Sequence, residues 1–93
     1  MFNPFRRKPS FIDLRYEALT IARSIPGHVK ADISNEDGTT EEVAYTEDAL
    51  NKIEDAMADA LDGCITQRKA RKIIGEELNM MRQISELARV SND

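Results

Sequence analysis

The sequence predicts a single α+β domain in the element order α-β-β-α-α, with an antiparallel β-hairpin packed on helices and a long C-terminal helix. Apolar residues recur at helical spacing in three segments, and they alternate with polar residues in two short segments joined by a glycine-containing turn. The chain has 93 residues, which is the size of one domain. We expect residues 1–9 to form an extended basic arm, and residues 10–93 to form the domain.

The first helix is predicted to begin after Ser10. Ser10 suits the N-cap position, and Asp13, three residues later, completes a capping box. Apolar residues at helical spacing then run from Phe11 to Ile25. Pro26, followed by a glycine, ends the helix.

Two short strands are predicted next. Residues 28–34 alternate apolar and polar side chains, as in a half-buried strand. A turn containing Gly38 leads to residues 39–45, where we expect Val43 and Tyr45 to face inward. Because an isolated hairpin is only marginally stable in water, its apolar face should lie on helices. The inward side chains of the first strand are then Val29, Ala31 and Ile33.

Two more helices follow. Thr46 is the expected N-cap of one helix, and Gly63 ends it. Thr66 is the expected cap of a final helix over residues 67–90, about 36 Å long at 1.5 Å rise per residue. The apolar residues of the earlier helix fall within about 140° of arc. They are Ala49, Leu50, Ile53, Ala56, Met57, Ala60 and Leu61.

The apolar stripe of the last helix spans about 180°, more than one neighbouring helix covers. It is either buried against the hairpin and both other helices, or it supports a homodimer through residues 67–90. Two charged residues also lie on apolar faces: Arg15 on the first helix and Glu77 on the last. Since a buried charge must be paired, we expect an ion pair between them, unless each side chain reaches solvent at the edge of a small core.

Composition and charge limit the class of protein. The 41% apolar and 32% charged residues are typical of a soluble globular domain. A single cysteine excludes an internal disulfide and suits a reducing cytoplasm. No apolar run approaches the length needed to cross a bilayer, and the first residues lack the pattern of a secretory signal. We therefore expect a cytoplasmic protein that does not interact with membranes.

Acidic residues gather in the middle of the chain. Residues 30–62 carry eleven acidic and two basic residues, whereas both ends carry more bases than acids. Such sorting bears on partners and solubility more than on fold. It indicates either a solvated face or a surface that binds a basic partner protein. Carboxylates on a helix diverge, so we expect no metal site. The candidate partner-binding residues are Glu41, Glu42, Asp48, Asp55, Asp59 and Asp62.

A basic cluster, residues 68–72, falls in the first turns of the last helix, where the helix dipole disfavours cations. We expect an anionic group to compensate. It is either the preceding acidic helix, folded back as a helical hairpin, or a phosphate backbone or acidic partner. No aromatic residues interleave with the bases, and the pI is about 5.0, which argues against nucleic acid. The candidate nucleic-acid-binding residues are Arg6, Arg7, Lys8, Arg68, Lys69, Arg71 and Lys72.

No catalytic, metal or nucleotide motif is present, and no cofactor is expected. His28 and Cys64 lie in different segments and form a nucleophile pair only if the fold brings them together. The charge pattern favours a non-enzymatic protein–protein interaction module, such as a small acidic inhibitor or regulator that covers a basic site on a larger protein. Many phage-encoded host-takeover factors are similar in size and charge. The alternative is a small nucleic-acid-binding protein that uses the arm and the 68–72 cluster.

Overall fold

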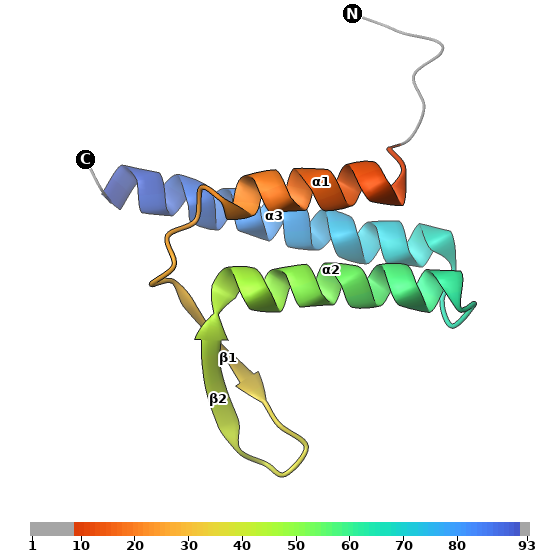
Figure 1. Ribbon diagram of the computed structural model, residues 1–93, viewed down its shortest axis with the longest axis horizontal. Helices are drawn as coiled ribbons and strands as arrows, with labels where there is room; N and C mark the ends of the chain where they lie inside the picture. The colour runs from red at the N-terminus through yellow and green to blue at the C-terminus, as the bar shows by residue number, and fades with distance from the viewer. Residues whose placement is uncertain (1–8, 92–93) are drawn as a thin grey trace, which may run out of the picture.

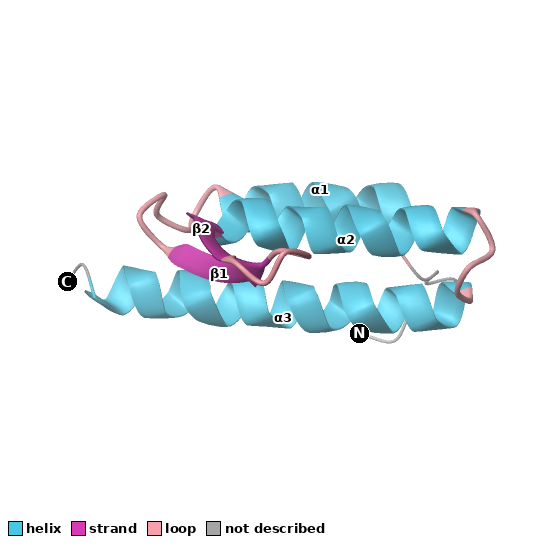
Figure 2. Ribbon diagram, turned by 90° about the horizontal axis from the view of Figure 1, so that it is seen from below, coloured by secondary structure: helices cyan, strands magenta, loops and turns pink. Residues whose placement is uncertain are grey.

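Three helices and one hairpin follow each other in the predicted α-β-β-α-α order (Figure 1). This computed structural model describes residues 9–91, so most of the predicted arm lies outside the described residues. Figure 2 shows α1 and α2 in one layer and α3 in a second layer, and α2 runs opposite to the other two helices. The elements are α1 (Phe11–Ala22), β1 (Lys30–Ser34), β2 (Thr40–Ala44), α2 (Tyr45–Leu61) and α3 (Gln67–Ser91).

Caps and glycines confirm several predicted boundaries. The Asp13 N–H donates to Ser10 Oγ at 3.2 Å, and the Ser10 N–H donates to the Asp13 carboxylate at 3.1 Å, which completes the capping box of α1. The Lys69 N–H donates to Oγ1 of the residue before α3, Thr66, at 3.1 Å. Gly63 follows α2 with φ of 79°, a left-handed conformation that glycine adopts without strain.

The start of α2 differs from the prediction. The helix begins at Tyr45 with Ala44 as its N-cap and without a side-chain cap, so the predicted Thr46 cap is wrong. The reason lies in the hairpin. The Tyr45 N–H donates to the Val29 carbonyl at 2.9 Å, so the strand ladder runs directly into the first turn of the helix. No residue is left between β2 and α2 to act as a side-chain cap.

The end of α1 also differs. The helix ends at Ala22, three residues before the predicted Ile25. The chain then forms turns with hydrogen bonds between residues three positions apart, in which the Ile25 N–H donates to the Ala22 carbonyl at 3.1 Å. Ile25 is nevertheless buried. Its spacing from the apolar residues of α1 therefore indicates that it packs in the core, although it lies beyond the end of the helix.

The core lies between the three helices. Its largest fully buried side chains are Ile53 of α2 and both Ile74 and Met81 of α3. Leu61, which the sequence places in the apolar arc of α2, is 78% exposed because it is the last residue of the helix and lies at the edge of that arc. The buried set is Leu14, Ala18, Ile25, Ala49, Ile53, Ala56, Met57, Ala70, Ile74, Leu78 and Met81.

The hairpin projects away from the helices (Figure 1). Among the described elements it contacts α2 alone. At its base, Val29 and Tyr45 pack against the core, as expected for a hairpin supported by helices. Farther out, Ala31 pairs with Val43 across the strands. The side chains of Ala31, Ile33 and Val43 are half-buried but lie outside the core and the residues packed on it.

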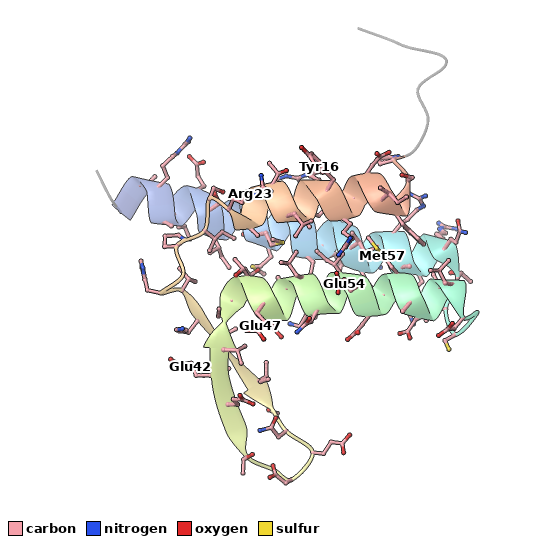
Figure 3. All side chains as sticks on the ribbon, in the orientation of Figure 1. Tyr16, Arg23, Glu42, Glu47, Glu54 and Met57 are labelled. Atoms are coloured by element: carbon pink, nitrogen blue, oxygen red, sulfur yellow. The ribbon has the colours of Figure 1, made fainter. Side chains whose placement is uncertain are left out.

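The predicted ion pair between Arg15 and Glu77 is wrong. The Arg15 Nε lies 3.1 Å from Oε1 of Glu54, which Figure 3 labels on α2. Both side chains are more than half exposed, so solvent screens this pair. The apolar face of α1 packs against α2 as well as α3, and the periodicity of one helix does not tell which neighbour an edge residue meets.

Candidate partner-binding surfaces

The predicted acidic stripe lies on the face of α2 opposite its buried residues. At 100° per residue, Asp55, Asp59 and Asp62 lie on the far side of the helix from Ile53, and all three are exposed. Asp48 differs, because its side chain is only 15% exposed and its Oδ2 lies 3.1 Å from Lys52 Nζ. Three of the four predicted helix acids are therefore available to a partner, and the fourth is already paired.

The surroundings of Asp48 form a small electrostatic cluster. Hydrogen bonding to Asp48 raises the pKa of Lys52. Burial of its hydroxyl, followed by the nearby charges of Glu77 and Asp48, raises the pKa of Tyr45 to about 12. Within residues 9–91, the buried Tyr45 Oη has no hydrogen-bond partner. These charges interact with one another within the domain.

The hairpin carries further acids. Glu41 and Glu42 are exposed, and Figure 3 shows Glu42 pointing away from the hairpin. Asp32 lies directly opposite Glu42 in the register, so two carboxylates share one face of the two strands. Like charges in such a pair repel each other. In the turn, the hydroxyl and backbone N–H of Thr39 donate to Asp37 and lower the pKa of its carboxyl.

The two acidic elements meet at an angle. The hairpin leaves the N-terminal end of α2 on the side away from α1 and α3, so it and the exposed face of α2 form the arms of an L (Figure 1). Within residues 9–91, none of five candidate acids forms an ion pair with a base. These five residues, called here the acidic L, are Glu41, Glu42, Asp55, Asp59 and Asp62.

The basic cluster is not neutralised by α2. The predicted helical hairpin of α2 and α3 forms, but in the described part of the chain none of its four bases pairs with a carboxylate. Asp55, Asp59 and Asp62 lie on the side of α2 opposite its buried residues, and Glu54 pairs with Arg15 of α1, which explains why the expected compensation is wrong. Arg71 instead donates to the Pro9 carbonyl, and its guanidinium lies 5.2 Å from the ring centroid of Phe11. The other bases, Arg68, Lys69 and Lys72, are exposed.

A groove of about 980 Å³ runs beside the start of α3. Leu14 and Ile73 contribute apolar surface to it, and the bases of the cluster line it. Its charge suits a phosphate or carboxylate group. The predicted arm residues Arg6, Arg7 and Lys8 lie outside the described residues. The groove is lined by Pro9, Leu14, Thr66, Arg68, Lys69, Arg71, Lys72, Ile73 and Glu76.

No family model, no curated protein and no solved structure matches the chain. Its function is therefore argued from its own residues. His28 and Cys64 lie beyond opposite ends of the 17-residue helix α2, about 25 Å apart along its axis, so the fold does not pair them. In residues 9–91, no three His, Cys, Asp or Glu side chains gather as metal ligands. The described helices include none with the length and apolarity to span a membrane.

Proposed function

We propose that this chain is a non-enzymatic interaction module that binds a partner protein through the acidic L. The observation that carries the proposal is that five exposed carboxylates on two projecting elements have no counterion within the described residues. A partner with a basic surface supplies those counterions. Charge complementarity of this kind steers encounter and speeds association.

The shape of the acidic L supports an inhibitor or regulator that acts by occupying a site. Residues 48–61 of α2 extend for about 21 Å, and the hairpin stands at one end of them. A convex basic surface seated in the corner contacts both arms at once. Covering such a surface excludes any other anionic ligand from it, nucleic acid included.

A matched pair of double variants tests the proposal. Asp55→Lys with Asp59→Lys reverses two charges of the acidic L, and Glu76→Lys with Glu86→Lys reverses two exposed acids of α3 outside it. Both variants change the net charge equally. Wild-type and variant proteins are immobilised at equal density, and the proteins that each captures from source cells are quantified by mass spectrometry.

We expect the wild type and the α3 variant to capture the same partner proteins, and the α2 variant to fail to capture them. The captured proteins should be released from the wild type as the salt concentration rises. Equal loss from both variants assigns the effect to net charge alone. Unchanged capture by the α2 variant shows that the stripe is not the binding site. Either result contradicts the proposal.

A second candidate function is nucleic-acid binding through the basic groove, favoured by its four bases without carboxylate partners. A labelled oligonucleotide should shift in a gel at low salt, and its affinity should fall steeply as salt rises. Replacing Arg68 and Lys72 by alanine should reduce the slope of that salt dependence. Absence of any shift at low salt excludes this function.

Self-association through α3 is a third proposal about partners. Met80 and Leu87 lie seven residues apart on one side of α3 and are 50% and 67% exposed. They form an adaptable apolar patch outside the buried arc. Light scattering at micromolar concentration measures the mass directly, and a species of 10.5 kDa rules out the dimer.

A further inference from the structure

The hairpin has a free edge along β2. The Asn35 N–H donates to the Thr39 carbonyl at 2.8 Å, and the same pairing recurs between Tyr45 and Val29 at 2.9 Å. In an antiparallel ladder, hydrogen-bonded pairs alternate with non-bonded pairs, so the odd-numbered residues of β2 bond to β1. The backbone groups that face outward from β2 and remain free are those of Thr40 and Glu42, since the carbonyl of Ala44, the N-cap residue, accepts the first hydrogen bond of α2.

Nothing in the described part of the chain covers this edge. The hairpin contacts α2 alone, and no backbone group of residues 40–43 bonds to a segment other than β1. Beside this edge, the side chains of Ile33 and Val43 are partly exposed and lie outside the core. An exposed edge of this kind is a template for an additional strand.

The charges on the two strands favour the edge along β2 as the binding edge and a basic segment as its partner. Glu41 and Glu42 are neighbours on β2, so their side chains point to opposite faces. A strand added beside β2 therefore meets a carboxylate on each face. On β1, Lys30 and Asp32 leave no net charge. A second copy of the hairpin would place carboxylates against carboxylates, which disfavours self-pairing.

We propose that β2 accepts an extended basic segment of the partner protein as a third strand of the sheet. Lysine or arginine side chains of that segment lie beside Glu41 and Glu42, and an apolar side chain lies beside Val43. Backbone hydrogen bonds from Thr40 and Glu42 hold the segment, and the carboxylates select its charge. This proposal rests on the proposed function. It adds that the part of the partner bound by the acidic L is an extended strand.

The probe is a fluorescein-labelled peptide of about seven residues, long enough to span the five residues of β2, in which valines flank two adjacent lysines so that each face of the added strand carries one lysine. Its control has the same sequence with N-methylated valines, which keeps the charge and removes backbone donors. Anisotropy measures affinity, and amide exchange measured by NMR locates the contact. We expect slower exchange of the Thr40 and Glu42 amides on binding, with no change at Asp32 and Ser34.

Two proline variants test the edge without changing any charge. Thr40→Pro removes one outward donor from β2, and Ser34→Pro, opposite it in the register, removes one from β1. Proline is tolerated where the strand N–H faces solvent. We expect Thr40→Pro to weaken peptide binding about tenfold and Ser34→Pro to leave it unchanged.

Equal affinity of Thr40→Pro and wild type overturns the proposal, as does equal affinity for the N-methylated peptide. If Thr40→Pro does not fold, amide exchange in the wild-type protein is the test. Edge pairing is overturned if the Thr40 and Glu42 amides exchange no more slowly with the peptide bound than without it. Binding that survives Thr40→Pro but is lost with Asp55→Lys and Asp59→Lys preserves the proposed function and removes edge pairing alone. A peptide that does not bind at all overturns the edge proposal, whereas the capture experiment still tests the proposed function.

Discussion

Replacement of Tyr45 by phenylalanine is expected to stabilise the domain. The Tyr45 hydroxyl is buried and has no hydrogen-bond partner within residues 9–91. Leaving such a group unpaired costs about 1–3 kcal/mol, and the ring that remains in phenylalanine fills nearly the same space. Because the side chain is only half-buried, we expect Tyr45→Phe to raise the free energy of unfolding at pH 7 by about 1 kcal/mol.

The same substitution should change the response to alkali. Burial, with the charges of Glu77 and Asp48, raises the pKa of Tyr45 from 10.0 to about 12. The folded state therefore holds the phenol proton more tightly than the unfolded state. Below pH 10 the phenol is protonated in both states, so the stability that this proton contributes is fully present. It is lost as pH rises from 10 to 12. A two-unit shift corresponds to at most about 2.7 kcal/mol, and solvent screening of a half-buried group reduces this to about 1–2 kcal/mol.

Urea unfolding followed by circular dichroism, at pH 7 and at steps between pH 10 and 12, measures both effects. Lysine titration is common to the two proteins, so the difference between wild type and Tyr45→Phe isolates the phenol. The stability advantage of the variant should widen over that range. A variant less stable than wild type at pH 7 shows that the hydroxyl has a partner. Parallel stability curves between pH 10 and 12 refute the electrostatic argument.

Four further substitutions test the packing, a helix cap and the hairpin. Ile53→Ala removes a fully buried side chain and should lower the free energy of unfolding by about 2–5 kcal/mol, whereas Ile12→Ala, at an 81% exposed position, should change it by less than about 0.5 kcal/mol in the same urea titration. Thr66→Ala removes the side-chain cap of α3 and should cost about 1 kcal/mol, with faster amide exchange in its first turn; unchanged exchange there contradicts the capping role. Asp32→Lys converts the repulsive pair with Glu42 into an attractive one and should add about 0.2–1 kcal/mol at low salt; a gain that persists at high salt argues against an electrostatic origin.

Element order and most helix ends were predictable because their signals are local. Ser10 and Thr66 cap their helices through residues three positions away, and Gly63 ends α2 through its own conformation. Strand ladders are less local, which is why the start of α2 was misplaced: the Tyr45 N–H bonds to Val29, sixteen residues earlier in the chain.

Charge pairing was predicted less well. The exposure of the α2 stripe follows from periodicity, and the spacing of Asp48 and Lys52 by four residues already carried the signal for their ion pair. The contact of Arg71 with Phe11 joins residues far apart in sequence and has no local signal. Helical periodicity identifies the face of a helix, but the neighbour of that face depends on how the helices assemble.

The core contains no residue from the hairpin. Among the residues whose burial the structure describes, every buried one lies in a helix except Ile25, which lies in the connection after α1. The end of α1 and the start of α2 lie at the same end of the bundle (Figure 1), so a short loop in place of residues 30–44 would join them. Substitutions in the hairpin are therefore largely exempt from the packing constraints on the bundle. The surface of the hairpin can diversify in evolution, or be exchanged by grafting, while the three helices keep their sequence.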